Sequence, residues 1–160
     1  MPAAVRALRG ATTVEADDPE AIESRTVELL EEMFGRNGVD HDDLISILFT
    51  VTDDLTSAFP ASGARTLGLG DVPLLCAREI PVPGSTARCI RVLAHLTTDR
   101  PRNELRHVYL EGAVNLRDDL PGWILNRLAA HRVKASQLVL EITETSFATD
   151  PVRATGLLEE

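Results

Sequence analysis

The chain has 160 residues, 44% of them hydrophobic, which is enough for one ordinary domain with a buried core plus an appendage. Acidic residues outnumber basic residues by 25 to 16, so the formal net charge is −9, and no basic stripe interrupts this balance. Nonspecific binding to nucleic acid or to an anionic membrane is therefore not expected, whereas local arginines could still hold a small anionic ligand.

Arginine dominates the basic residues: 15 of the 16 are arginine, and Lys134 is the only lysine. Every positively charged side chain before Lys134 is therefore a planar guanidinium, which can bind both oxygens of a carboxylate. The cysteines Cys76 and Cys89 are too few for a disulfide framework and lack zinc-binding spacing. The sequence contains no secretion signal and no apolar run of about 18 to 20 residues that could span a bilayer, so we expect a soluble, cytoplasmic protein.

Strands and helices are predicted to alternate from the start of the chain. Val5–Val14 is rich in β-branched residues and predicts a first strand that runs into a turn at Gly10. Asp18 followed by Pro19 is typical of a helix start, and apolar residues then recur at helical spacing until Gly35–Gly38.

Three further strands are predicted at Leu44–Thr52, Val72–Glu79 and Cys89–Thr98, the first of them apolar enough for both faces to be buried. A short helix is expected from Phe59–Pro60 to about Leu67. The stretch Glu104–Arg117 fits a helix and a strand equally well. The expected architecture over these residues is an α/β (α+β) fold, a mixed sheet with helices packed on one face.

The pattern changes from Asp119 onward. Leu120–Val133 predicts an amphipathic helix, Leu138–Glu144 a buried strand, and Asp150–Pro151 the start of a helix that is still in progress at Glu160. We therefore expect an extra α-β-α fragment, from a truncated gene fusion or a fragmentary reading frame.

Arg91 is the most informative residue of the predicted strand Cys89–Thr98. Because side chains alternate along a strand, Ile90, Val92, Ala94 and Leu96 form one apolar face, and Arg91 lies on the other. A guanidinium that is partly desolvated needs a carboxylate partner. That partner is either Glu79, on the strand expected beside it, or a carboxylate carried by a ligand.

Other candidate sites have weaker support. Cys76 could act as a nucleophile only beside a base such as His95 or His107, and a buried structural cysteine is the preferred interpretation. The four histidines show no metal-binding spacing, so no metal is expected. Gly68–Gly70 lacks the remaining features of a nucleotide-binding loop.

Six segments together carry a family resemblance: Arg9–Glu15, Asp54–Ala61, Val72–Cys76, Cys89–Val92, Arg106–Glu111 and Leu116–Arg117. In order and spacing they resemble the AroH-class monofunctional chorismate mutases over about residues 4 to 120. The resemblance implies a trimeric pseudo-barrel whose active sites lie between subunits and convert chorismate to prephenate for phenylalanine and tyrosine synthesis, without a cofactor.

The resemblance also implies the site residues. The catalytic residues would be Arg9, Glu79, Arg91 and Tyr109, and the substrate-binding residues Phe59, Ala61, Arg65, Cys76, Leu116 and Arg117. Two positions depart from the family pattern, because Ser62 replaces a lysine and Leu75 a threonine. These departures leave open an alternative, a noncatalytic sensor of the same fold that binds an acid of the aromatic pathway.

The expected reaction explains the residue types. Chorismate is a dicarboxylate, and its pericyclic rearrangement needs no nucleophile, metal or proton transfer. The site must hold the enolpyruvyl arm over the ring and neutralise the charge that develops on the ether oxygen, and arginine forks suit both tasks. Arg91 is expected at the ether oxygen, with Arg9 and Tyr109 on the side-chain carboxylate and Glu79 and Cys76 at the ring hydroxyl.

The C-terminal stretch resembles something else. Leu120–Ile124 and Leu138–Thr145 are similar to one segment of EAL-type cyclic-di-GMP phosphodiesterase domains, in which Glu141 would be a metal ligand and Glu144 would support a loop. A complete barrel of that type needs about 250 residues. The expected organisation is a chorismate mutase domain at 1–119 and a truncated EAL-like fragment at 120–160 without phosphodiesterase activity. A signalling fragment whose functional part is the tail is the third hypothesis.

Overall fold

The computed structural model describes residues 3–116. The chain divides into two units, Met1–Leu116 and Arg117–Glu160, and all the described residues belong to the first. The elements predicted within 120–160, and the site residue Arg117, lie outside the described residues. Within 3–116, no helix is both long and apolar enough to cross a membrane.

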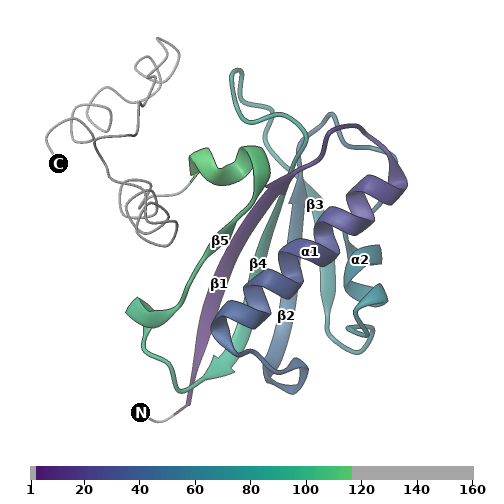
Figure 1. Ribbon diagram of the computed structural model, residues 1–160. Helices are drawn as coiled ribbons and strands as arrows, with labels where there is room; N and C mark the ends of the chain where they lie inside the picture. The colour runs from purple at the N-terminus through teal and green to yellow at the C-terminus, as the bar shows by residue number, and fades with distance from the viewer. Residues whose placement is uncertain (1–2, 117–160) are drawn as a thin grey trace, which may run out of the picture. The chain divides into compact units, whose positions relative to one another are not determined.

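A mixed five-stranded sheet forms the framework, as expected. Its strands are β1 (Ala4–Thr13), β2 (Leu44–Val51), β3 (Leu74–Arg78), β4 (Cys89–Thr98) and β5 (Val108–Tyr109), in the spatial order β3-β2-β4-β1-β5 (Figure 1). The central strand β4 pairs antiparallel with β1 and β2, whereas β3 and β5 add to the edges in parallel.

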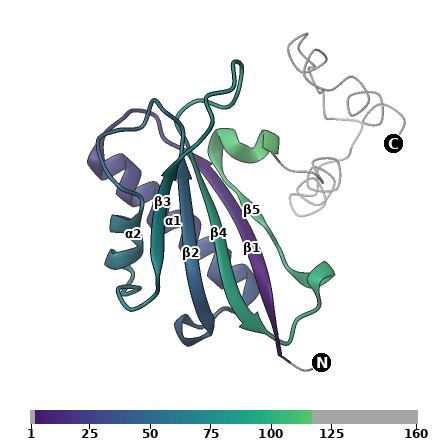
Figure 2. The same ribbon diagram turned by 180° about the vertical axis from the view of Figure 1, so that it is seen from behind.

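Two helices, α1 (Pro19–Asn37) and α2 (Ala61–Thr66), cover the same face of the sheet. Seen from behind, the strands lie in front of both α-helices, and neither α1 nor α2 covers this second face (Figure 2). Three short 3₁₀ turns complete the unit: η1 (His41–Asp43), η2 (Arg102–Glu104) and η3 (Glu111–Leu116). One face of the sheet is therefore packed against α1 and α2. We call the other the uncovered face, because only η3 among the described helices packs on part of it.

The limits of α1 follow from its predicted end signals. Asp18 Oδ2 accepts a hydrogen bond from the Ala21 N–H at 3.0 Å, and Pro19 occupies the first turn. At the other end Gly38 adopts the left-handed conformation, with φ of 59°, and closes the helix. Between these ends the apolar stripe packs on the sheet.

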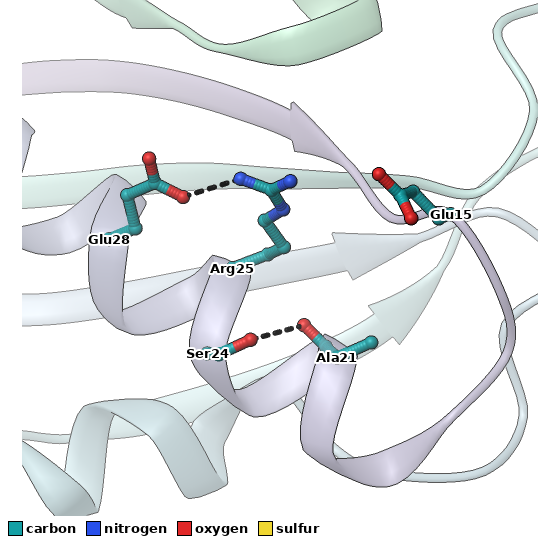
Figure 3. A pocket seen from close by; sticks show the side chains of 5 residues that line it. All are labelled: Glu15, Ala21, Ser24, Arg25 and Glu28. Atoms are coloured by element: carbon teal, nitrogen blue, oxygen red, sulfur yellow. Dashed lines mark hydrogen bonds and ion pairs between the residues drawn. The ribbon is translucent and has the colours of Figure 1, made fainter.

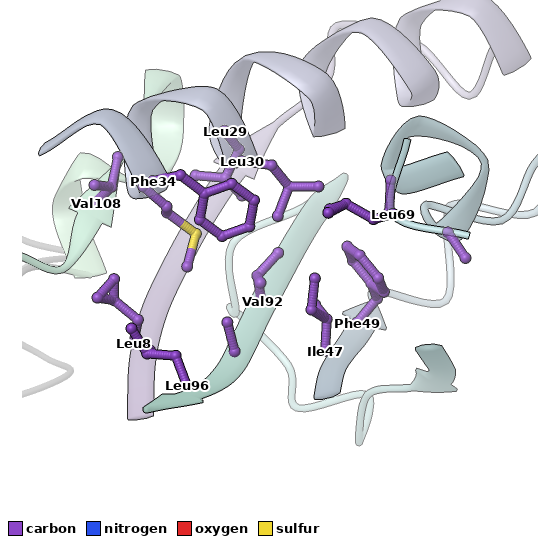
Figure 4. Packing of buried hydrophobic residues seen from close by; sticks show 14 residues of the cluster. Leu8, Leu29, Leu30, Phe34, Ile47, Phe49, Leu69, Val92, Leu96 and Val108 are labelled. Carbon is purple, nitrogen blue, oxygen red and sulfur yellow. The ribbon is translucent and has the colours of Figure 1, made fainter. Parts of the chain in front are cut away.

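The core lies between α1 and the helix-covered face of the sheet (Figure 4). Leu29, Leu30 and Met33 of α1 are completely buried, as are Leu8 of β1 and Phe49 of β2. Burying each such side chain contributes roughly 1.5–3 kcal/mol relative to leaving it exposed. This packing fixes which face of every strand points inward.

Gly10 is not the turn that its residue type suggested. Strand β1 continues through it to Thr13, and Gly10 lies opposite Val92 of β4. A Cβ atom at Gly10 would stand 2.2 Å from Met33 Sδ. The glycine is therefore required by the close approach of α1, a contact that the local sequence does not reveal.

Strand β2 differs from the prediction that both of its faces are buried. Ile47 and Phe49 are fully buried beneath the helices, but Ile45 is 43% exposed and Leu48 only partly buried. The ambiguous stretch after Glu104 is also resolved, because it forms the two-residue strand β5 followed by η3. The other strands and helices predicted within residues 3–116 agree with the structure within a few residues.

Candidate active site

The side chains of β4 alternate as the sequence predicted. Ile90, Val92, Ala94 and Leu96 are at most 3% exposed and face the helices. Arg91 therefore lies on the uncovered face, opposite Ala11 of β1 on one side and Thr50 of β2 on the other. The central strand thus presents a guanidinium on the sheet face that neither α1 nor α2 covers.

Arg91 is paired and still accessible. Its Nε lies 3.3 Å from Glu79 Oε1 and is buried without a hydrogen bond in acceptable geometry. The side chain as a whole is 41% exposed, whereas that of Glu79 is only 14% exposed. The two alternatives for Arg91 are therefore compatible, because Glu79 orients the guanidinium while the rest of the fork stays available to an anion.

Glu79 reaches Arg91 in a way that the sequence did not predict. Strand β3 is not the neighbour of β4, because β2 lies between them. Glu79 follows the end of β3, and its N–H donates to Val51 O at 2.9 Å. Thr50 Oγ1 donates to Glu79 Oε1 at 2.6 Å and so holds the carboxylate beside Arg91.

Thr50 belongs to the Arg91–Glu79 cluster, and sequence reasoning missed it. It lies on β2 directly opposite Arg91, and its hydroxyl binds the carboxylate that orients the guanidinium. A threonine in an apolar strand also has high intrinsic strand propensity, so nothing in its local sequence marks it as part of a site.

Arg9 and Tyr109 lie on the same uncovered face. Arg9 of β1 is opposite Leu93 of β4, and Tyr109 of β5 is opposite Ala11 of β1. The Arg9 backbone N–H donates to His107 Nδ1 at 3.1 Å, which joins β1 to the segment that carries Tyr109. The four predicted catalytic residues thus share one face of the sheet.

Cys89 lies next to Arg91 but is not a reactive thiol. It is completely buried in a cluster with Ala11 and Ala113, against which Tyr109 and Leu116 pack. Burial raises the pKa of the Cys89 thiol above its ordinary value, even though the Arg91 guanidinium acts in the opposite direction. A neutral thiol at this position fills space rather than attacking a substrate.

The predicted substrate-binding residues divide into two groups. Leu116 lies in the cluster beside Tyr109, on the Arg91 side of the sheet. Cys76 is opposite Phe49 of β2 and packs against the helix-side core, so its side chain lies on the opposite face from Arg91. One chain therefore does not bring Cys76 to its own Arg91.

The remaining wall residues belong to the α2 region. Phe59 is 72% exposed just before α2, Ala61 is 5% exposed within the core, and Arg65 is exposed in the last turn. Of the two departures from the family pattern, Ser62 lies within α2 and Leu75 is 60% exposed on β3. Both departures thus lie at the α2 and β3 end of the sheet, whereas Arg91 lies on its central strand.

Two surface depressions lie elsewhere, along α1. One of about 260 Å³ is lined by Glu15, Ala21, Ser24, Arg25 and Glu28 (Figure 3), and the other mainly by glutamates of α1. Neither includes Arg91. Across residues 3–116, no three His, Cys, Asp or Glu side chains gather where they could hold a metal ion.

Comparison with known proteins points to one family. Residues 5–120 match the family described as chorismate mutase type I. Over 117 residues the chain is 58% identical to a chorismate mutase AroH of Thermus thermophilus, covering 72% of this chain and 96% of that protein. It is 44% identical, also over 117 residues, to a chorismate mutase AroH of Bacillus subtilis strain 168, covering 72% and 92%.

A solved structure supports the same relationship. The chorismate mutase from Clostridium thermocellum aligns with a TM-score of 0.67 and 50% identity, covering 68% of this chain and 96% of that chain. The matched part therefore corresponds to nearly the whole of these relatives.

Proposed function

The chain belongs to the chorismate mutase type I family, and we propose that it performs its reaction on the uncovered sheet face around Arg91. As a member of that family it is an isomerase that converts chorismate to prephenate in aromatic amino acid biosynthesis. The rearrangement is intramolecular, so the protein must restrict the substrate's conformation and stabilise the charge that develops in the transition state.

Arg91 is assigned to the ether oxygen, where negative charge grows as the carbon–oxygen bond breaks. Its position supports this role, because Glu79 orients the guanidinium beforehand and 41% of the side chain remains exposed. A donor that is already oriented stabilises developing charge without reorganising during the reaction. Arg9 and Tyr109, on the same face, are assigned to the carboxylate of the enolpyruvyl arm.

The ring end of the substrate is assigned to Glu79 and Cys76, which would bind its hydroxyl group.

The observation that carries the proposal as a whole is that four polar side chains lie on one face of the sheet: Arg9, Glu79, Arg91 and Tyr109. Leu116 and Phe59 would exclude water, Ala61 would complete the apolar wall, Arg65 would add a cation at the rim, and Arg117 would close over the pocket.

We place each active site between two subunits of a homotrimer. Cys76 lies on the opposite sheet face from Arg91 in its own chain, so a substrate held by both needs a second copy. Exposed apolar side chains support such an assembly, since Phe59, Leu75, Ile80 and Val82 are each more than half exposed. One copy would supply the Arg91 face and its neighbour the α2 and β3 wall.

The activity is tested by adding chorismate and following the loss of its ultraviolet absorbance. Turnover supports the assignment. Saturable binding without turnover would instead support the noncatalytic sensor that Ser62 and Leu75 left open, and the absence of both would refute the assigned site.

The shared site is tested by mixing two inactive proteins. Arg91→Ala removes the catalytic face, and Arg65→Glu places a charge that repels a dicarboxylate on the opposite wall. In randomly mixed trimers, about a quarter of the interfaces would combine two intact halves, so about a quarter of wild-type activity is expected. No recovery after verified subunit exchange would contradict a site between subunits.

The catalytic domain is placed at 1–119, in keeping with a family match that ends at residue 120. The family match and the curated relatives give no support to the EAL-like resemblance of 120–160, and we assign no phosphodiesterase activity to those residues. A cytoplasmic location is proposed because Cys76 and Cys89 are both free thiols.

A further inference from the structure

Asn37, the last residue of α1, holds a distant part of the chain by its side chain. It is 2% exposed. Its Nδ2 donates to Met33 O at 2.7 Å and to Arg106 O at 2.9 Å, and its Oδ1 accepts from the Arg106 N–H at 2.8 Å. The amide therefore satisfies both backbone groups of Arg106, as a residue of a neighbouring strand would.

This contact lies just before β5, which consists only of Val108 and Tyr109. So short a strand forms few backbone hydrogen bonds to its neighbour. Val108 and Tyr109 pair with Gly10 and Ala11 of β1, and Leu110 N–H donates to Ala11 O at 2.9 Å. A one-residue slip would exchange the buried Val108 with Tyr109. Asn37 fixes the residue from which the pairing begins.

A second contact from α1 lies beyond β5. Arg25 Nη1 contacts Glu111 Oε1 at 3.0 Å as well as Glu28 Oε2 at 2.8 Å, and Figure 3 shows the Arg25–Glu28 pair. Glu111 has φ of 50°, in the left-handed region that glycine adopts more readily. Unlike glycine, a glutamate at this position can form an ion pair with Arg25 of α1. Residues of α1 therefore contact the chain on both sides of Tyr109, at Arg106 and at Glu111.

We infer that Asn37 is a positioning residue for catalysis: it sets the register of β5 and so places the Tyr109 hydroxyl beside Arg91. The inference rests on the proposed function, in which Tyr109 binds the substrate's carboxylate. Such a contact exists in both the ground state and the transition state. Its loss raises KM more than it lowers kcat.

The first test is Asn37→Ala, with steady-state kinetics on chorismate. A hydrogen bond to a charged group contributes about tenfold or more to affinity. We expect KM to rise about five- to tenfold while kcat stays within about threefold. Simple loss of folded protein would do the opposite, because it lowers the apparent kcat and leaves KM unchanged.

A double-mutant cycle with Tyr109→Phe shows whether Asn37 acts through Tyr109. If it does, Asn37→Ala should raise KM by less than about twofold in the Tyr109→Phe background, because the hydroxyl it positions is already missing. Independent, multiplying effects would overturn the inference. Asn103→Asp is the matched control: it changes an exposed asparagine of η2 on the same segment, and it should leave KM unchanged.

Amide hydrogen exchange separates this inference from the proposed function. Asn37→Ala should speed exchange at Val108–Leu110 at least tenfold while the amides of β4 keep their protection. This result would show that Asn37 stabilises the pairing of β5, whether or not the wild-type chain turns over chorismate. A wild-type chain without turnover would refute only the proposed function. Unchanged exchange at β5 would refute the stabilisation of this strand by Asn37.

A surface variant keeps the test available if Asn37→Ala does not fold. Arg25→Gln removes the second contact at a side chain that is 27% exposed. Faster exchange at Gly112, whose N–H donates to Thr13 Oγ1 at 3.0 Å, with a rise in KM of about twofold, is the expected result. Protection and KM both equal to wild type would refute positioning of this segment by α1.

Discussion

Replacing Arg91 tests the assigned chemistry most directly. Removing one donor aimed at developing charge typically costs about 3–4 kcal/mol of transition-state stabilisation, which is roughly 100- to 1000-fold in kcat. Arg91→Ala should therefore nearly abolish turnover. Arg91→Lys should stay strongly impaired, because the ammonium keeps the charge but loses the planar fork that binds two oxygens.

The structure limits how far instability could explain such a loss. The Arg91–Glu79 pair is 41% and 14% exposed, and Glu79 keeps its hydrogen bond from Thr50 when Arg91 is removed. An exposed ion pair contributes up to about 1 kcal/mol, and removing one partner of a buried pair costs about 3–5 kcal/mol. The cost of removing Arg91 lies between these limits. A domain that is stable by about 5–15 kcal/mol therefore stays folded.

The assay follows the absorbance of chorismate, with thermal unfolding measured in parallel. Arg36→Ala is the matched control, because Arg36 forms an ion pair with Glu32 at 2.6 Å and is 40% exposed, close to the exposure of Arg91. It should leave kcat unchanged. If either Arg91 variant kept kcat within about tenfold of wild type with the assembly intact, the electrostatic role assigned to Arg91 would be wrong.

Three further predictions concern stability and chain length. Gly63→Ala places a Cβ 2.9 Å from a carbonyl oxygen of α1 and should lower the free energy of unfolding by about 1–3 kcal/mol in denaturant titration, whereas Gly70→Ala, with no atom within 4 Å, should have little effect. Hydrogen bonds, chiefly from Ser57, lower the pKa of Asp17 from 3.8 to about 2. Ionised Asp17 thus stabilises the fold above pH 4, and the Tm advantage of wild type over Asp17→Asn should shrink as the pH falls from about 4 to 2; a constant difference would contradict this. A chain ending at Leu120 should keep kcat within about twofold of the full chain, because the match to the family ends there.

The side-chain pattern predicted which way each strand faces. The apolar residues of β4 alternate with Arg91, so burial of one face was enough to place the guanidinium on the other. The order of the strands in the sheet could not be predicted from this alternation. The interposed β2, and with it the role of Thr50 in holding Glu79, depends on a pairing between segments far apart in the chain.

Two local patterns were misleading for the same physical reason. Gly10 has the residue type of a turn, but it lies in a strand because Met33 of α1 leaves no room for a Cβ. The stretch after Glu104 has no clear period, because β5 is too short to show one and is held by Asn37 from another element. In both cases a contact with α1 decides the conformation, and local propensity does not.

The placement of Cys76 shows why a single sequence could suggest the site's members but not their arrangement. Parallel pairing with β2 puts Cys76 on the helix side, and the same pairing puts Glu79, three residues later, on the Arg91 side. An odd spacing along one extended segment sends two side chains to opposite faces of the sheet. If both residues bind one substrate, as proposed, they must come from different copies, so the alternation of a single strand is itself an argument for an active site shared between subunits.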